Sequence, residues 1–171
     1  SSYVLNTWYP LTWSRNVGRQ LSAHRIIEKD VVVYRTEAGK PVAMEDACPH
    51  RLLPLSMGKL KGDTIECGYH GLRFDCAGKC TRVPGQDMIP ANAVVTTYPV
   101  HENMGLLWIW MGEPALADTA KVFDLPQYHD PAWSSVEGDA LRIEANYLSL
   151  ADNLCDPAHV SFVHLSTLGN A

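Results

Sequence analysis

Two short segments of the chain each offer one thiol and one imidazole in the same order. Cys48 and His50 form the first pair, Cys67 and His70 form the second, and sixteen residues separate the two segments. Thiolates bind soft and borderline metals, and a neutral imidazole adds a less electron-donating nitrogen ligand. The four side chains therefore predict a metal–sulfur site, and both zinc and iron fit this set of ligands.

The equal division of the ligands between the segments favours a cluster of two inequivalent irons. A structural zinc site usually takes its second pair as two His or two Cys, whereas here each segment supplies one of each. In a Rieske [2Fe-2S] centre, one iron takes both cysteines and the other takes both histidines, so each segment would give one ligand to each iron. A zinc-binding module is the alternative interpretation.

The residues around these ligands resemble the Rieske family. They read Cys48-Pro49-His50-Arg51 and Cys67-Gly68-Tyr69-His70-Gly71-Leu72, and Val83-Pro84-Gly85-Gln86 resembles the proline loop that covers the cluster in that family. Gly68 and Gly71 allow a close approach of the backbone, so that amide N–H groups can point at cluster sulfurs and stabilise the reduced state. The resemblance implies that Cys48, His50, Cys67 and His70 hold a [2Fe-2S] cluster.

A second group of candidate metal ligands lies near the end of the sequence. His159 and His164 are five residues apart, with Asp156 just upstream, and two histidines with a carboxylate can bind mononuclear Fe(II). Five residues turn a side chain by about 140° on a continuous helix, so the backbone must bend or end between the histidines. Taken alone, these residues do not establish a metal site. His159 could cap a helix or pack in a core, His164 could be a surface residue, and Asp156-Pro157 is an ordinary helix start.

A Rieske motif followed by Asp-x-x-His-x-x-x-x-His resembles the terminal oxygenase component of the Rieske non-haem iron oxygenases. Further similarity, to aryl O-demethylase oxygenases such as vanillate demethylase and to toluenesulfonate methyl-monooxygenase, lies in Asn6-Thr7-Trp8-Tyr9, Leu107-Trp108-Ile109-Trp110-Met111-Gly112 and Asp152-Asn153-Leu154. The resemblance implies that His159 and His164 hold a catalytic Fe(II). It also implies that Asp156 links the cluster to this iron across a subunit boundary in a homotrimer.

The same resemblance implies the reaction and its partners. Electrons from NAD(P)H would pass through a separate flavin and iron–sulfur reductase to the cluster. The enzyme would then use O₂ to oxidise a small aromatic substrate, by O-demethylation or methyl hydroxylation. A stand-alone Rieske-type ferredoxin, acting as an electron carrier, is the alternative, but such a carrier needs no second histidine pair.

Two features depart from the family pattern. Pro157 stands where an apolar residue usually keeps the helix regular, and a kink there could displace Asp156. The family supplies a third, carboxylate iron ligand far downstream, whereas none of residues 165–171 is acidic, and about forty residues after the expected linker are too few to bury an α/β core. We therefore expect a truncated chain or a partial structure, and the sequence does not identify the substrate.

Composition limits the class of protein. The chain has 171 residues, of which 46% are hydrophobic, and a formal net charge of -5. The chain contains no run of eighteen apolar residues that could span a bilayer and no basic stripe that would indicate nucleic-acid binding. We therefore expect neither a membrane nor a nucleic acid as a partner. The odd number of cysteines argues against a disulfide framework, although Cys76 and Cys80 could face each other across a hairpin turn. Free thiols without a signal-like N-terminal segment predict a cytoplasmic protein.

The expected fold class is α+β. It combines an all-β Rieske domain of antiparallel sheets over residues 1–115, a linker over 116–133, where Pro and charged residues interrupt the pattern, and the start of an α/β helix-grip catalytic domain over 134–171. Clusters of β-branched and aromatic residues predict strands at 31–34, 42–45, 64–67, 72–75, 94–98 and 106–110. Cys48 follows one of these strands and Cys67 ends another, so both metal-binding segments should lie at hairpin tips.

Overall fold

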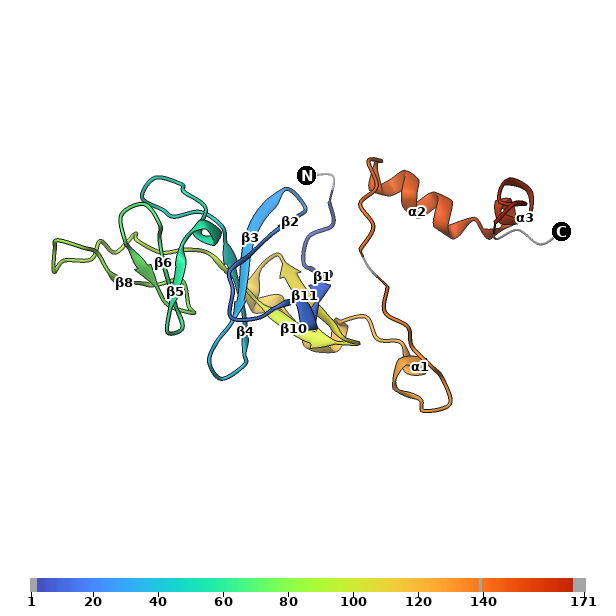
Figure 1. Cartoon of the computed structure of the whole chain (residues 1–171), viewed down its shortest axis with the longest axis horizontal. Helices are drawn as coiled ribbons and strands as arrows, with labels where there is room; N and C mark the ends of the chain where they lie inside the picture. The colour runs from blue at the N-terminus through green and yellow to red at the C-terminus, as the bar shows by residue number, and fades with distance from the viewer. Residues whose placement is uncertain (1–2, 139, 168–171) are drawn as a thin grey trace. The chain divides into compact units, whose positions relative to one another are not determined.

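The structure, a computed structural model, describes residues 3–138 and 140–167. The chain divides into two compact units, Ser1–Trp133 and Ser134–Ala171. Every strand of the described residues lies in the first unit, and the strands run from blue at β1 to yellow at β11 in Figure 1.

Three antiparallel sheets build the described part of the first unit (Figure 1). The first sheet has the order β1 (Thr7–Trp13), β11 (Leu106–Met111), β10 (Val100–Asn103). The second has the order β2 (Ser22–Ile26), β3 (Lys29–Arg35), β4 (Pro41–Glu45), β9 (Thr97–Tyr98). The third has the order β5 (Lys59–Lys61), β6 (Thr64–Glu66), β7 (Arg73–Phe74), β8 (Cys80–Arg82).

Strand β3 is buried on both faces and separates two hydrophobic cores. Val31 and Val33 pack toward β11, in a core with Leu107 and Ile109. The alternate residues of β3, Val32 and Tyr34, join a second core that includes Ile65 and Phe74 of the third sheet, together with Cys48, Cys67 and Leu72. Because successive side chains of a strand point to opposite faces, an uninterrupted apolar run suits a strand in this position. The second core carries both candidate metal-binding segments.

The chain after β11 continues to pack on the first unit. Two 3₁₀ turns, η3 (Pro114–Leu116) and η4 (Thr119–Lys121), are followed by a short helix, α1 (Pro126–His129). The indole Nε1–H of Trp8 donates a hydrogen bond to the carbonyl oxygen of Asp118 (2.8 Å), and Val122 is buried against Trp8, Trp108 and Trp110. A buried indole needs such an acceptor. The beginning of the expected linker is thus fixed to the sheet that contains β1 and β11.

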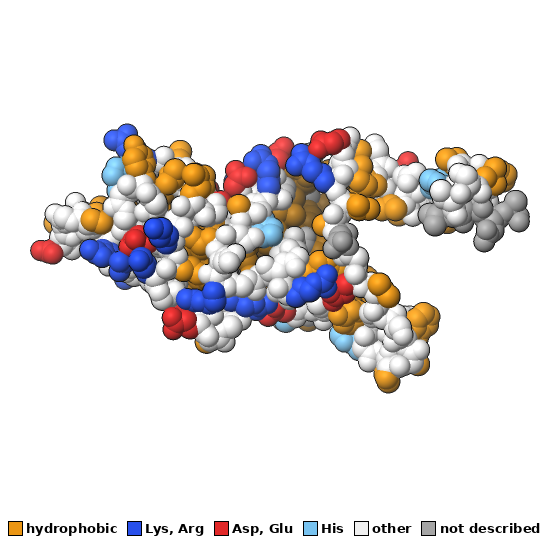
Figure 2. All heavy atoms as spheres, in the orientation of Figure 1, with side chains coloured by type: hydrophobic (Ala, Val, Ile, Leu, Met, Phe, Trp, Pro, Cys, Tyr) orange, Lys and Arg blue, Asp and Glu red, His pale blue; other side chains and the backbone are white. Residues whose placement is uncertain are grey.

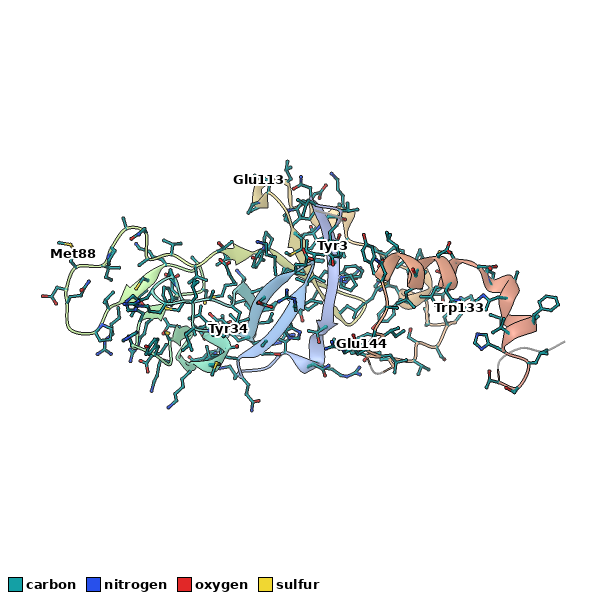
Figure 3. All side chains as sticks on the ribbon, turned by 90° about the horizontal axis from the view of Figure 1, so that it is seen from above. Tyr3, Tyr34, Met88, Glu113, Trp133 and Glu144 are labelled. Carbon is teal, nitrogen blue, oxygen red and sulfur yellow. The ribbon has the colours of Figure 1, made fainter. Side chains whose placement is uncertain are left out.

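The cysteines outside the two candidate segments, Cys76, Cys80 and Cys155, are free thiols. Cys76 donates from Sγ to the carbonyl oxygen of Asp63 (3.4 Å), and Cys80 donates from Sγ to that of Arg82 (3.4 Å). The hydroxyl of Tyr34 contacts both the Asp63 carbonyl (2.9 Å) and Cys76 Sγ (3.5 Å). Figure 3 labels Tyr34 within the body of the first unit, where it connects β3 to the turn between β5 and β6.

The regular secondary structure of the described part of the second unit is helical. It contains α2 (Tyr147–Cys155), the 3₁₀ turn η5 (Pro157–His159) and α3 (Val160–Val163). The side chain of Asn146 accepts a hydrogen bond from the amide of Leu148 (2.9 Å) and caps α2. None of the described residues from 134 to 167 is buried. No helix in the described part of the chain is long and apolar enough to cross a membrane.

Candidate metal centres

The two segments that carry the Cys and His pairs form the same backbone turn. In the first ligand loop, residues 48–53, the amide of Cys48 donates to the carbonyl of Leu53 (2.9 Å) and the amide of Leu52 donates to that of Cys48 (2.8 Å). In the second, residues 67–72, the equivalent bonds run from Cys67 to Leu72 (2.8 Å) and from Gly71 to Cys67 (3.0 Å). Leu52 (φ 59°) and Gly71 (φ 73°) are both left-handed. The loops therefore present their cysteines in matching positions.

The two cysteine sulfurs lie together inside the core. Cys48 and Cys67 are each 2% exposed and belong to the same hydrophobic core. Burial raises the pKa of Cys48 to about 11; the amide N–H groups of His50 and Arg51 oppose the rise, while the neighbouring thiol adds to it. Amides directed at sulfur stabilise negative charge there, which a thiolate ligand requires. An iron bound to this pair would replace the thiol protons.

The two imidazoles lie together at the surface. The ring centroids of His50 and His70 are 4.7 Å apart at an angle of 65°, and both residues are exposed. The ring of Tyr69 packs against that of His70 at 3.9 Å between centroids. The ligand loops thus place paired sulfurs inside and paired nitrogens outside, and the outer pair is open to a partner.

This pairing fits a two-iron cluster. No group of three His, Cys, Asp or Glu side chains in the described residues converges in a way that could hold a single metal ion. Each iron of a Rieske cluster takes only two protein ligands. The Cys48–Cys67 and His50–His70 pairs supply two for each.

The loop that follows β8 lies against the second ligand loop. A Cβ atom at Gly71 would lie 3.2 Å from Cγ of Pro84, so the absence of a side chain at Gly71 allows this close approach. A hollow of about 320 Å³ opens beside it, lined by Pro49, His50, Leu72, Val83, Gln86, Pro90, Asn92 and Ala93. The segment Val83–Gln86 therefore borders the exposed imidazole end, as expected for a loop that covers a cluster.

Asp46 fixes the first ligand loop and was not predicted from the sequence. Its carboxylate is 7% exposed and accepts hydrogen bonds from the amide (2.7 Å) and the hydroxyl (2.6 Å) of Ser56. These bonds tie the end of β4 to the 3₁₀ turn η2 (Leu55–Met57), on either side of residues 48–53. An acidic residue two positions before a candidate Cys ligand was the available signal. It was overlooked because a lone Asp in a loop has many ordinary uses.

The second unit brings His159, His164 and Asp156 around one hollow. The ring centroids of His159 and His164 are 5.4 Å apart. The hollow, of about 520 Å³, is also lined by Ser149, Asp152, Asn153 and Val163. Ser149, which has no distinguishing signal in the sequence, lies one helical turn before Asp152 and Asn153 on α2. Two imidazoles and two carboxylates therefore border the same space.

The backbone between these histidines changes form twice, as the five-residue spacing requires. Helix α2 ends at Cys155, His159 closes the 3₁₀ turn η5, and His164 follows the end of α3. Pro157 begins the new turn, and Asp156 caps it by accepting a hydrogen bond at Oδ1 from the amide of Ala158 (3.2 Å). Pro157 thus interrupts the helix without removing Asp156 from the hollow.

The carbonyl of Asp156 also sets the tautomer of His159. Nδ1 of His159 lies 2.5 Å from this oxygen. Because a carbonyl oxygen can only accept, Nδ1 carries the proton and the lone pair of the ring is on Nε2. Nε2 is therefore the atom available to a metal.

Comparison with known families decides the class of the protein. A model of the Rieske [2Fe-2S] domain matches residues 7–99, more than half of the chain. The chain belongs to the Rieske [2Fe-2S] family. A model of the vanillate O-demethylase oxygenase C-terminal domain matches residues 143–171 of this Rieske protein, the part that contains Asp156, His159 and His164.

Relatives of this Rieske protein include several oxygenase components. It is 38% identical over 168 residues to the toluene-4-sulfonate monooxygenase system iron-sulfur subunit of Comamonas testosteroni, covering 98% of this chain and 48% of that protein. It is 35% identical over 164 residues to a vanillate O-demethylase oxygenase subunit of Pseudomonas sp., covering 96% of this chain and 46% of that one. These matches confirm the resemblance to both groups of oxygenases.

Solved structures agree with the sequence comparison. The crystal structure of dicamba monooxygenase bound to dicamba matches with a TM-score of 0.88 at 37% identity, covering 96% of this chain and 49% of that one. The predicted antiparallel Rieske fold is therefore confirmed. The chain spans about half the length of the relatives it matches.

Proposed function

We propose that this Rieske protein acts as, or forms part of, the terminal oxygenase component of a Rieske non-haem iron monooxygenase. The observation that carries the proposal is the presence, in one chain, of paired buried thiols and paired exposed imidazoles on matching loops, followed by a second pair of imidazoles with a carboxylate. A ferredoxin would use only the first of these sites. The oxygenase components among its relatives support the oxygenase over the ferredoxin.

In this proposal the four side chains of the ligand loops hold a [2Fe-2S] cluster. Cys48 and Cys67 hold one iron inside the core, and His50 and His70 hold the other at the surface. When bound, the cluster supplies storage of one electron at a time, and the mononuclear Fe(II) supplies activation of O₂. The buried cysteines keep water from the sulfur end, and the exposed histidines give electrons a path out of the domain.

His159 and His164 are proposed as ligands of the mononuclear Fe(II), with Nε2 as the donor atom of His159. A third, carboxylate ligand would come from outside the described residues. We propose that Asp156 bridges a cluster histidine of one subunit and the iron-binding histidines of the next in a homotrimer. Its Oδ1 serves the cap of η5, and its second oxygen, Oδ2, can accept a hydrogen bond from an imidazole N–H.

The remaining parts of the proposal concern the whole protein. A flavin and iron–sulfur reductase would deliver electrons from NAD(P)H, and O₂ would oxidise a small aromatic substrate by O-demethylation or methyl hydroxylation. We place the protein in the cytoplasm and divide the chain into a Rieske domain (1–115), a linker (116–133) and a fragment of the catalytic domain (134–171). Support comes from the match of residues 143–171 to an oxygenase C-terminal domain.

Two variants of the protein, produced from its complete coding sequence, test these assignments. We expect His70→Ala to abolish the visible absorption and the Rieske-type electron paramagnetic resonance signal of the reduced protein. We expect His159→Ala to keep both signals and to lose only the mononuclear iron and the oxidation of substrate. A colourless wild-type protein with one zinc per chain would support the zinc-binding module instead. Unimpaired substrate oxidation in His159→Ala would remove that histidine from the iron site.

A further inference from the structure

The outer face of the sheet β5–β8 carries an unusual density of positive charge. The inward residues of its strands, Leu60, Ile65 and Phe74, pack on the core of the first unit. The outward residues at alternating positions are polar: Thr64 is neutral, and the charged residues, of which all but Glu66 are basic, are Lys59, Lys61, Glu66, Arg73 and Arg82. We call these five residues the basic face. In Figure 2, Lys and Arg side chains gather over this sheet.

Strand register places four members of the basic face in one row across the sheet. Lys59 pairs with Glu66, Glu66 with Arg73, and Arg73 with Arg82. Nε of Arg73 lies 2.7 Å from a carboxylate oxygen of Glu66. This hydrogen bond holds the pKa of Glu66 below its usual range, and the charges of Arg73, Lys61 and Arg82 lower it further. The charges of Arg73, Lys61 and Arg82 therefore all act on the carboxylate of Glu66.

The basic face has more positive charge than it can neutralise itself. Glu66 is its one acidic member, and among the described residues no carboxylate forms an ion pair with Lys59, Lys61 or Arg82. The chain as a whole has a formal net charge of -5. A positive surface on an acidic chain attracts negatively charged partners selectively and orients them as they approach.

The basic face is also the surface from which the second ligand loop starts and to which it returns. Glu66 directly precedes Cys67, and Arg73 directly follows Leu72. At the other side of the sheet, Arg82 precedes Val83, the first residue of the segment that borders the imidazoles. A partner bound on these strands would be close to the paired thiols and imidazoles.

We propose that the basic face is the docking surface for an electron-donating protein with an acidic surface around its own iron–sulfur centre. This inference rests on the proposed function. In the step it serves, one ferrous iron of the reduced donor becomes ferric, and one ferric iron of the Rieske cluster becomes ferrous. One electron moves, and no atom or bond is exchanged.

The surface around the imidazoles has a different character, which leaves it to another partner. Apart from Arg51, which is exposed beside His50, the ligand loops present large apolar side chains to solvent, Leu52 (73% exposed) and Tyr69 (62%). Met88, at the end of the long loop after β8, points away from the body of the unit in Figure 3. An acidic protein gains little from such a surface. The basic face is thus suited to binding the protein that donates electrons, and the apolar surface around the histidines is suited to the partner that accepts them.

Two variants with equal changes of charge test the proposal. Lys59→Gln/Lys61→Gln removes two exposed cations from the basic face. The matched control Lys29→Gln/Lys121→Gln removes two exposed cations from β3 and η4. The probe is a plant-type [2Fe-2S] ferredoxin of net negative charge. Its binding in the oxidised form is followed by biolayer interferometry, and the transfer of an electron from its reduced form to the cluster is followed by stopped-flow absorption.

For Lys59→Gln/Lys61→Gln we expect the association rate and the rate of cluster reduction to fall about fivefold at low ionic strength. At about 1 M salt, where the Debye length is about 3 Å, the difference from wild type should shrink below about twofold. The control should change by less than twofold throughout. Equal effects of both variants, or no effect of either, would overturn the docking proposal.

Reduction by photoreduced 5-deazariboflavin, a small uncharged donor, separates this proposal from the proposed function. If every variant shows the Rieske absorption and accepts an electron from deazariboflavin at the wild-type rate, any defect with ferredoxin belongs to docking. If the wild-type protein itself lacks the cluster signal, the proposed function fails, and the docking proposal fails with it. Far-ultraviolet circular dichroism confirms that the variants are folded.

Discussion

Leu52 and Gly71 occupy equivalent positions in the two ligand loops, but only Gly71 suits the left-handed backbone that both adopt. A non-glycine residue with positive φ carries about 1–2 kcal/mol of strain. Leu52 is exposed and packs on little, so it keeps this strain without an evident packing gain. At Gly71 a side chain would meet the same strain and would also press on Pro84.

Exchanges at these two positions should therefore have opposite signs. We expect Leu52→Gly to raise the free energy of unfolding by about 0.5 kcal/mol, since relief of strain outweighs the added freedom of the unfolded chain. We expect Gly71→Ala to lower it by about 1–2 kcal/mol. Urea unfolding followed by circular dichroism measures both values. Destabilisation by Leu52→Gly would show that its side chain has a packing role.

Asp156 has two separable properties, a capping oxygen and a negative charge. Asp156→Asn keeps an oxygen that can cap η5, whereas Asp156→Ala removes it and should cost about 1 kcal/mol of stability. If Asp156 links the two metal centres, we expect both variants to keep their metals and to slow reoxidation of the reduced cluster by at least tenfold in the presence of substrate and O₂. Stopped-flow absorption measures this rate. If reoxidation is slow in Asp156→Ala but proceeds at the wild-type rate in Asp156→Asn, the effect comes from the loss of the cap alone.

At the scale of the elements, Gly78 holds the turn after β7 against the segment that leads into β9. It has φ of 76°, and a Cβ atom there would overlap the carbonyl oxygen of Val95. Gly39 has a similar φ of 80° but open space around it. We expect Gly78→Ala to destabilise the protein by more than about 3 kcal/mol and Gly39→Ala by about 1 kcal/mol. Thermal unfolding compares them, and equal losses would show that the contact with Val95 adds nothing to the strain.

The same contact explains why the strand predicted at 94–98 is only partly formed. The amide of Val95 donates to the carbonyl of Gly78 (2.8 Å), whereas Thr97 and Tyr98 pair with β4. The segment switches partners between two sheets, and its composition cannot reveal the switch because both partners are distant in sequence. The runs that became β3 and β11 were predictable, since residues 31–34 are all β-branched or aromatic and residues 106–110 contain two tryptophans and an isoleucine.

Strand β1 was not predicted, because Pro10 interrupts its apolar run. A proline in a central strand removes a hydrogen bond of the ladder. In the structure β1 is an edge strand that pairs only with β11, and its register shifts between Pro10 and Thr12. The missing N–H therefore costs little. Only the order of the strands, which depends on long-range pairing, shows that a proline is tolerated here.

The candidate sites were easier to predict than the sheets, because their residues are close in sequence. Cys48 with His50 and Cys67 with His70 lie in short turns whose spacing is visible in the sequence. The structure then places the two thiols together and the two imidazoles together. Their role as cluster ligands stays a prediction, as does that of His159 and His164. Asp46 was missed because its partner, Ser56, lies ten residues away, beyond the loop that the pair holds closed.

At the scale of the whole first unit, Arg35 and Glu102 join two sheets. Arg35 on β3 contacts the carboxylate of Glu102 on β10 at 2.5 Å and donates to the carbonyls of Val17 (2.8 Å), Ser14 (3.0 Å) and Gly39 (2.9 Å). Its hydrogen bond lowers the pKa of Glu102, and burial opposes the shift. The folded state thus favours the ionised carboxylate, so this pair stabilises the protein above the ordinary glutamate pKa of about 4.3.

This stability should be lost as the pH falls through the lowered pKa of Glu102, because the folded state then takes up the proton that the unfolded state has already bound. With the side chain of Glu102 40% exposed, we expect Glu102→Gln to cost about 1 kcal/mol at pH 7, and the cost should shrink toward zero below about pH 4. Urea unfolding of both proteins between pH 7 and pH 3.5 measures the difference. Glu37→Gln is the control, since its carboxylate is 72% exposed and 3.8 Å from Arg19, and it should change stability by less than about 0.5 kcal/mol. A cost for Glu102→Gln that stays constant down to pH 3.5 would mean that the side chain acts through neutral packing and hydrogen bonds, and that its charge does not hold the sheets together.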